Sequence, residues 1–171
     1  MSTANDIAPL VEQGRLLHVV PDLPGLSVVR DVFATQSVYE FLTDEDAIPA
    51  QYARVSGRAK AKIDHFISGG VVTFALDPQD KARTSFIARN DPVEMGIVDV
   101  RITDPKPMIR IFGGFAARNI LVLIVWHPRE GLHFQQAVID CRREWNSLFN
   151  NSAPLIGDTH ECYLTGHFEI G

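Results

Sequence analysis

Residues 97–126 read IVDVRITDPKPMIRIFGGFAARNILVLIVW and carry the pattern that decides the fold. Apolar and polar residues alternate over 97–103, which is the two-residue period of a half-buried strand. A proline-rich turn follows, and 108–115 is expected to form a second strand, in which Gly113 and Gly114 indicate a bulge or twist. Residues 120–126 are apolar on both faces, so the third strand should be central and covered on both sides.

Helical patterns lie on both sides of these three strands. Thr35 and Ser37 are candidate caps for a first helix. Pro49 suits the first turn of a second helix, which Gly69 and Gly70 would end. The apolar stripe of that second helix recurs every three or four residues, at Tyr52, Val55, Ala59, Ile63 and Phe66. A closing helix follows the strands, with an apolar face made of Phe134, Val138, Cys141, Trp145 and Leu148.

The remaining segments show weaker patterns. Residues 26–33 are rich in valine and are expected to form a first strand. Residues 16–20 could be a short strand or an anchoring segment, and 71–76 a strand or an apolar part of a loop. Residues 77–91 have little periodicity and are expected to be mostly loop. The turn-rich tail has room for one short strand near 162–164.

We expect three regions along the chain: an N-terminal extension (1–25), one domain (26–149) and a C-terminal tail packed on that domain (150–171). The chain has 171 residues, 46% of them hydrophobic and 22% charged, which is typical of a globular protein with one sizeable core. The net charge of −5 and the pI of about 5.6 argue against a surface coated in positive charge for nucleic acid. They leave room for a local basic face.

The sequence patterns favour a cytoplasmic protein with no membrane partner. The first seven residues are polar and lack the charged and apolar blocks of a signal peptide. The longest apolar run, 120–126, is too short to span a bilayer. Cys141 and Cys162 are expected to be reduced thiols, although one bridge between them is an alternative.

Three segments are similar to strand motifs of the RelE/ParE superfamily of bacterial toxins and their phage-encoded relatives. Residues 98–102 (VDVRI) resemble the strand that ends in a hydrophobic–arginine pair. Residues 109–112 (IRIF) look like the strand in which an arginine lies between apolar residues. Residues 121–129 (LVLIVWHPR) resemble the apolar strand that ends in a basic turn. The order of expected elements over 26–149 is similar as well.

The resemblance implies an α+β fold: a strand, a helical hairpin, a three-stranded antiparallel meander that completes a four-stranded sheet, and a C-terminal helix, with extra segments at both ends. It also implies the toxin of a toxin–antitoxin pair, an endoribonuclease that cuts mRNA at the ribosome. The implied partners are an antitoxin protein, mRNA and the ribosome, and no cofactor is expected.

Arginines on the expected strands are candidate phosphate ligands. Cutting RNA at a 2′-hydroxyl needs a proton acceptor, a proton donor and cations for the developing charge. A guanidinium holds phosphate bidentately and stays charged, so we assign phosphate binding to Arg101, Arg110 and Arg129. Arg110, Arg129 and His127 are the candidate catalytic residues, with His133 as a further acid or base.

Whether these arginines share one face depends on the strand register, which the sequence does not give. The alternative interpretation is that they are solvated residues at strand ends, with local acidic partners such as Asp99, Asp104 and Glu130.

Arg54, Arg58 and Lys62 form a basic stripe at a spacing of four residues along the second helix. Such stripes are usually solvated faces, and the sharper hypothesis is a partner-binding surface for ribosomal RNA, for an acidic antitoxin segment or for another partner. His160, Cys162 and His167 lack the tight paired spacing of a zinc site, so we expect no metal.

A second hypothesis is a non-catalytic module that binds a protein partner or self-associates, in a phage or mobile-element setting. The acidic pI and the interruption of the basic turn by Pro128 favour it. Fold by itself does not decide between these functions, and the sequence leaves the oligomeric state open.

Overall fold

Eight strands form one mixed sheet in the computed structural model, which describes residues 3–80, 85–166 and 168–170. The strands are β1 (Leu17–Val19), β2 (Asp31–Ala34), β3 (Val72–Ala75), β4 (Ile87–Arg89), β5 (Val98–Ile102), β6 (Ile109–Ala117), β7 (Ile120–Pro128) and β8 (Phe168–Ile170). They lie in the order β1-β2-β7-β6-β5-β4-β3-β8. The β2–β7, β3–β4 and β3–β8 pairs are parallel, and the other neighbours are antiparallel.

Helices cover the sheet and its ends. The α-helices are α1 (Ile7–Glu12), α2 (Gln36–Thr43), α3 (Ala53–Ile67), α4 (Phe134–Leu148) and α5 (His160–Tyr163). Short 3-10 helices are η1 (Thr3–Asp6), η2 (Glu45–Ala47), η3 (Ala50–Tyr52) and η4 (Val93–Met95).

The fold is α+β, but the prediction of a four-stranded sheet is wrong. The expected meander is present as β5, β6 and β7, and β2 pairs with β7. β1 extends this sheet beyond β2, and β4, β3 and β8 extend it beyond β5. The eight-stranded sheet therefore conflicts with the RelE/ParE-like architecture that the sequence pattern indicated.

Strands of three or four residues account for this difference, because so short a strand cannot show a clear two-residue period. β4 lies within 77–91, where the pattern predicts mostly loop. The short strand expected near 162–164 is not present, because Cys162 and Tyr163 belong to the helical turn α5, and β8 follows later in the chain. The strand alternative is correct for 71–76, as β3, and for 16–20, as β1.

The three main predicted helices are confirmed as α2, α3 and α4. The apolar stripe of α3 is buried against the sheet, including Val55, Ala59, Ile63 and Phe66. The helix ends before Gly69, whose φ of +86° is a left-handed conformation that favours glycine. α4 has the predicted apolar face, with Val138, Cys141 and Trp145 buried.

The predicted bulge is also confirmed, and it explains why a glycine lies there. The β6–β7 register shifts between Phe112 and Gly113. A Cβ atom on Gly113 would lie 2.0 Å from the carbonyl oxygen of Val122, so a larger residue would push β6 and β7 apart.

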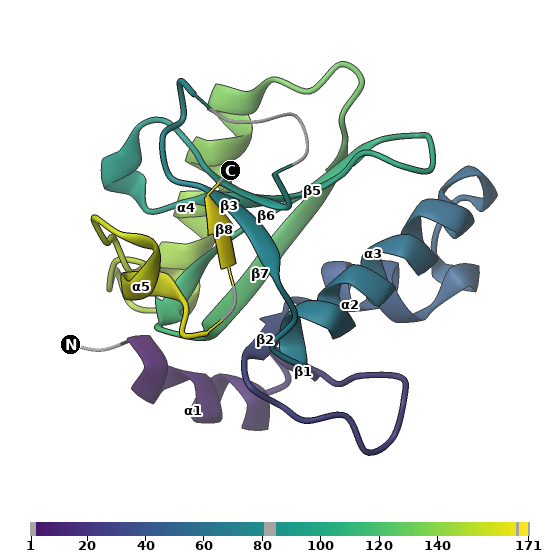
Figure 1. Ribbon diagram of the computed structural model, residues 1–171, viewed down its shortest axis with the longest axis horizontal. Coiled ribbons are helices and arrows are strands. Elements are labelled where there is room, and N and C mark those ends of the chain that lie inside the picture. Colours follow the sequence, from purple (N-terminus) through teal and green to yellow (C-terminus); the bar gives the residue numbers. More distant parts are fainter. Residues whose placement is uncertain (1–2, 81–84, 167, 171) are drawn as a thin grey trace.

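The two faces of the sheet are covered by different helices (Figure 1). One core packs α2 and α3 on residues such as Val100, Ile109 and Ile111. The second core packs α1 and α4 on residues such as Phe112 and Val122. Asp99, Arg101 and Arg110 alternate with the first set along β5 and β6, so their side chains point to the α4 face.

The N-terminal region contributes to this second core. Ile7 and Leu10 of α1 are buried there, and the hydroxyl of Thr3 donates to the carbonyl of Ala116 at 2.6 Å. The first expected strand, 26–33, is shorter than predicted, because β2 begins at Asp31 and residues 22–29 are exposed. Within the described ranges, none of the helices is long and apolar enough to cross a membrane.

Candidate functional site

The register of the meander brings the candidate arginines to one face of the sheet. Arg101 of β5 lies opposite Arg110 of β6, and Arg110 lies opposite His127 of β7. Residues that are paired across antiparallel strands point to the same side of a sheet. The backbone N–H of Arg129, just beyond β7, donates to the carbonyl of Met108 at 2.8 Å, which holds Arg129 beside the start of β6.

These three arginines line one hollow of about 270 Å³, which we call the arginine hollow. Its lining residues are Asp99, Arg101, Arg110, Arg129 and Phe134. Three guanidinium groups against one carboxylate leave the hollow with a formal charge of +2. The hollow therefore suits a small anionic group.

Asp99 is the counter-charge of Arg110. The Nε atom of Arg110 lies 3.4 Å from a carboxylate oxygen of Asp99, and the two side chains are 5% and 1% exposed. The other carboxylate oxygen of Asp99 accepts a hydrogen bond of 3.0 Å from the amide of Asn90. An Nη atom of Arg110 donates to the carbonyl of Ile109 at 3.0 Å. These contacts fix the guanidinium plane of Arg110 at the base of the hollow.

The electrostatics of Arg110 show how close the positive charges lie. Burial and, to a smaller extent, the charges of Arg101 and Arg129 lower the pKa of Arg110 to about 10, although Asp99 opposes this shift. Arg110 therefore remains charged at neutral pH. Its interaction with Arg101 and Arg129 is repulsive, and an anion among the three groups would relieve that repulsion.

Phe134, the first residue of α4, forms the aromatic wall of the hollow. The guanidinium carbon of Arg129 lies 4.9 Å from the centre of the Phe134 ring, in a cation–π contact. The Phe134 ring also packs edge-on against Phe112. The sequence pattern placed Phe134 on the core face of the helix, and the signal for its second role is that it begins this helix only five residues after Arg129.

His127 shares the sheet face with the arginines but does not line the arginine hollow. Its ring packs against Phe112, and it lines a neighbouring cavity of about 310 Å³ together with His133, Gln136 and Asp140. Burial lowers the pKa of His127 below its ordinary value of 6.5, while Asp140 and Glu144 oppose this shift. His127 is therefore neutral at pH 7 and able to accept a proton.

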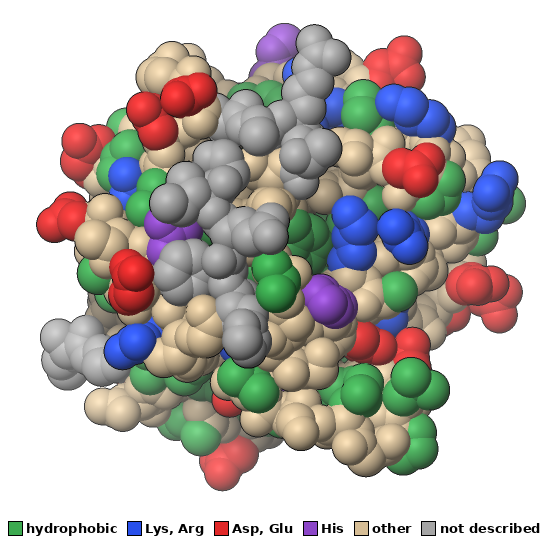
Figure 2. All heavy atoms as spheres, in the orientation of Figure 1, with side chains coloured by type: hydrophobic (Ala, Val, Ile, Leu, Met, Phe, Trp, Pro, Cys, Tyr) green, Lys and Arg blue, Asp and Glu red, His purple; other side chains and the backbone are tan. Residues whose placement is uncertain are grey.

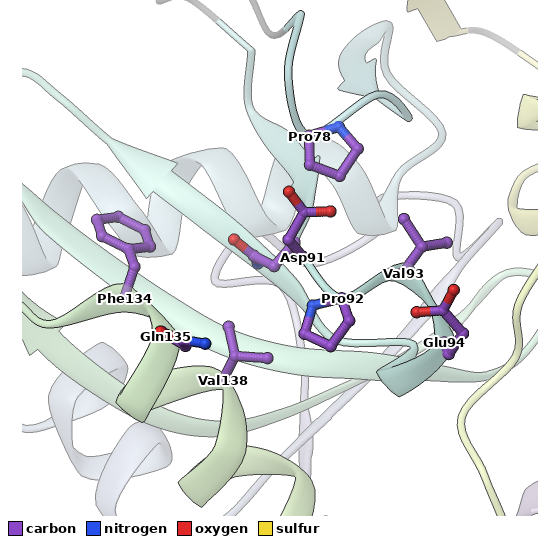
Figure 3. A pocket seen from close by; sticks show the side chains of 9 residues that line it. Pro78, Asp91, Pro92, Val93, Glu94, Phe134, Gln135 and Val138 are labelled. Carbon is purple, nitrogen blue, oxygen red and sulfur yellow. The ribbon is translucent and has the colours of Figure 1, made fainter.

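A larger cavity of about 550 Å³ adjoins the hollow, and we call it the side cavity. Figure 3 shows that its walls come from α4 and from the segment after β4. Phe134 lines both spaces, and Asn90 of the side cavity donates to Asp99 of the hollow. The further lining residues of the side cavity are Pro78, Asp91, Pro92, Val93, Glu94, Gln135 and Val138.

The basic stripe of α3 lies on the helix that covers the other face of the sheet. Arg54 and Arg58 are exposed, and the Nζ atom of Lys62 lies 5.8 Å from the centre of the Phe86 ring. Burial and the charge of Arg58 lower the pKa of Lys62, and Asp104 opposes this. Because α3 covers one face of the sheet and the arginine hollow lies on the α4 face, the stripe and the hollow are separate features. Figure 2 shows basic side chains among acidic ones on the face that it draws.

The residues considered for zinc have other roles. The Nε2 atom of His160 is 2.7 Å from the carbonyl oxygen of Phe74, Cys162 is exposed, and His167 lies outside the described residues. No group of three or more His, Cys, Asp and Glu side chains that could hold a metal occurs in the part of the chain that the structure describes. Both cysteines are free, and Cys141 is buried beside Glu144, which together with burial raises its pKa.

Comparison with known proteins found no matching family model, no matching curated protein and no matching solved structure.

Proposed function

We propose that the protein binds a backbone phosphate of single-stranded RNA in the arginine hollow. The observation that carries this proposal is the convergence of Arg101, Arg110 and Arg129 on one space with a formal charge of +2. A guanidinium offers a planar set of donors that matches phosphate oxygens. Buried Arg110 would hold the phosphate in place, and the more exposed Arg101 and Arg129 would close around it.

Two features favour RNA in single-stranded form. An aromatic ring beside a cationic groove is the usual arrangement for unstacked bases, and Phe134 supplies that ring. The net charge of −5 disfavours long contacts along a duplex, which need many basic residues. One well-built phosphate contact next to an aromatic side chain fits an acidic protein better.

Cleavage of the bound RNA would need His127 in addition. Neutral His127 could accept the proton of a 2′-hydroxyl while the 2′-oxygen bonds to phosphorus, the bond from phosphorus to the 5′-oxygen breaks and solvent protonates that oxygen. The position of His127 opposite Arg110 favours this role. Its place outside the hollow means that the geometry supports binding more directly than cleavage. The toxin, antitoxin and ribosome expectations rest on a resemblance whose four-stranded sheet this fold does not have, so we propose RNA binding alone.

Fluorescence anisotropy with a labelled decauridine tests the proposal. We expect Arg101→Gln and Arg129→Gln each to weaken binding about tenfold or more, because each removes a charge-assisted hydrogen bond to phosphate. Arg118→Gln is the matched control, since Arg118 is exposed in the β6–β7 turn and is not part of the hollow. Equal affinity in all four proteins would contradict the proposal.

Cleavage is measured separately by incubating the decauridine with protein and separating the products on a gel. His127→Gln should abolish cleavage while leaving the anisotropy titration unchanged. Binding without cleavage by the unmodified protein would leave a non-catalytic RNA-binding function.

A second candidate function, self-association, is favoured by an exposed apolar segment between β1 and β2. Leu23 is 67% exposed and Val28 57% exposed, and Leu26 and Val29 are also exposed. Together with Gly57 and Ala61 of α3, Leu23 and Leu26 line a shallow cavity of about 410 Å³. Apolar side chains gathered on a surface in this way often mark a protein–protein contact.

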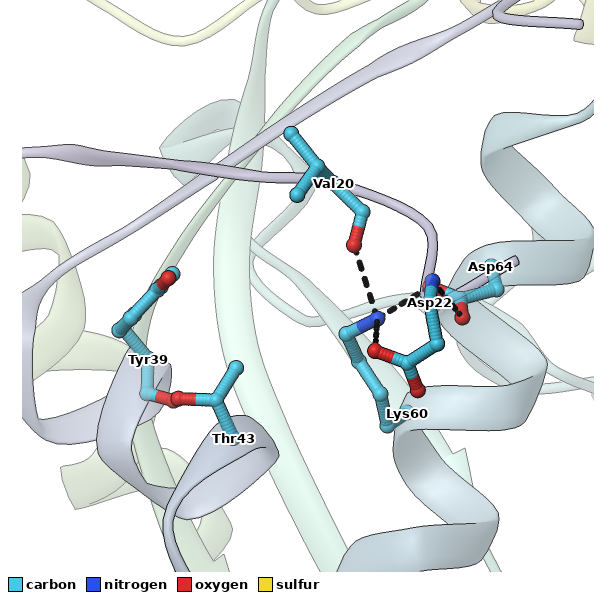
Figure 4. A network of polar contacts seen from close by, with 6 residues as sticks. All are labelled: Val20, Asp22, Tyr39, Thr43, Lys60 and Asp64. Atoms are coloured by element: carbon cyan, nitrogen blue, oxygen red, sulfur yellow. Dashed lines mark hydrogen bonds and ion pairs between the residues drawn. The ribbon is translucent and has the colours of Figure 1, made fainter. Parts of the chain in front are cut away.

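The segment is held in this exposed position by Lys60 (Figure 4). The Nζ atom of Lys60 donates to the carbonyl of Val20 at 2.9 Å and contacts Asp22 at 3.0 Å and Asp64 at 2.6 Å. If the chain self-associates here, sedimentation velocity should show a concentration-dependent dimer that Leu23→Ser with Val28→Ser abolishes. A monomer at all concentrations would exclude this candidate.

A further inference from the structure

The side cavity next to the arginine hollow has the features of a nucleobase site. Its volume of about 550 Å³ falls in the range of small-molecule pockets, and it opens between α4 and the segment after β4. Val138, Pro78 and Pro92 give it apolar walls, and Phe134 joins it to the hollow. A ligand that fills both spaces must carry an anionic group at one end and, at the other, a body that packs against these apolar walls.

Two of the four polar side chains that line the side cavity, Asp91 and Glu94, are negatively charged hydrogen-bond acceptors, and the other two are the amides of Asn90 and Gln135. Asp91 and Glu94 are both exposed, and Figure 3 shows them on the segment after β4, with Asp91 below Pro78 and Glu94 beside Val93. The side chain of Gln79 donates to the carboxylate of Asp91 and fixes its position. Carboxylates accept and do not donate, so the ligand must offer hydrogen-bond donors to this wall.

Among the four RNA bases, guanine fits this wall best. Its N1–H and N2 amino groups are neighbouring donors on one edge, which matches the two oxygens of a carboxylate. Adenine and cytosine each place an acceptor nitrogen next to their single amino group, and uracil places carbonyls on both sides of its N–H. An acceptor facing Asp91 or Glu94 would be repelled.

We therefore propose that the side cavity binds the guanine base of a nucleotide whose phosphate lies in the arginine hollow, an inference that rests on the proposed RNA-binding function. Phe134 stacks on or against the base, and Glu94 and Asp91 select guanine through its donor edge. The negative charge of Asp91 and Glu94 disfavours any nucleotide that cannot donate to them.

Pentanucleotides of equal charge test this inference, because they differ in one central base: UUGUU, UUAUU, UUCUU and UUUUU. We expect the unmodified protein to bind UUGUU about tenfold more tightly than the other three. Glu94→Gln and Asp91→Asn should reduce this preference while affinity for UUUUU stays equal or rises. Glu45→Gln is the matched control for loss of negative charge, because Glu45 is exposed and does not line the side cavity.

The stacking role of Phe134 has a different signature. Phe134→Leu should weaken binding of all four pentanucleotides by a similar factor, because stacking tolerates every base. Equal affinity of the unmodified protein for the four RNAs would overturn the guanine site and leave the phosphate site standing. Failure to bind any of them would overturn the phosphate site as well.

Discussion

Arg110 is buried beside a carboxylate, while Arg101 and Arg129 at the same hollow stay partly exposed. The three arginines therefore have two different tasks. Asp99 and Asn90 hold Arg110 within the fold, and its charge is present before any ligand arrives. The two outer arginines can then adjust to the ligand.

Arg110→Met tests the structural part of this arrangement. The change leaves Asp99 charged, buried and without its guanidinium, so we expect the free energy of unfolding to fall by about 3 kcal/mol. The double change Arg110→Met with Asp99→Asn should recover much of that loss, because it also removes the buried negative charge of Asp99. Urea denaturation measures both, and equal stability of the unmodified and Arg110→Met proteins would contradict the buried pair.

The lowered pKa of His127 predicts a pH dependence of stability. Between the folded pKa and the unfolded value of about 6.5, the unfolded chain binds more protons at this site. The contribution of His127 to stability is therefore full above pH 6.5 and is lost as the pH falls through the folded pKa. Denaturation from pH 7.5 to 5 should show a smaller drop for His127→Gln, and parallel curves for the two proteins would contradict the shift.

At the scale of single elements, the long strands and helices could be predicted and the short strands could not. The alternation in β5 and the stripe of α3 extend over enough residues to show their period. β4 has three residues, and its place beside β5 depends on contacts between distant parts of the chain. The strands that carry Arg101 and Arg110 were therefore predictable, whereas the register that unites them and the contribution of Asn90 were not.

The β6–β7 bulge gives a matched pair of glycine substitutions. Gly113→Ala should destabilise the protein, toward the upper end of about 1–3 kcal/mol, because the new methyl group would meet the Val122 carbonyl. Gly57→Ala, in the interior of α3 with nothing within 4 Å of the new Cβ atom, should stabilise it by about 0.5–1 kcal/mol. Thermal unfolding of the two variants checks both signs, and destabilisation by Gly57→Ala would argue against this placement of α3.

The Lys60 contacts should control the order of the segment between β1 and β2. Lys60→Met removes the donor to Val20, Asp22 and Asp64, and we expect a loss of about 1–3 kcal/mol in stability. Hydrogen exchange of residues 20–30 should become faster as well. Arg58→Met on the exposed face of the same helix is the control, and unchanged exchange in Lys60→Met would show that other contacts hold the segment.

For the whole molecule, the salt dependence of RNA binding distinguishes one local site from a broad basic surface. One phosphate neutralised by the three arginines predicts a shallow slope of log K against log salt, about −0.7, since each neutralised phosphate of a single strand contributes about that amount. Arg54→Gln with Arg58→Gln should leave this slope unchanged, because both residues lie on α3 and outside the hollow. A much steeper slope that falls in this double variant would assign the binding to the α3 stripe.

A crystal structure of the protein with a bound pentanucleotide would show whether Arg101, Arg110 and Arg129 together hold one phosphate. We expect a phosphate within hydrogen-bond distance of all three guanidinium groups, with the neighbouring base against Phe134. A bound oligonucleotide whose phosphates lie along α3, with none of them in the arginine hollow, would contradict it.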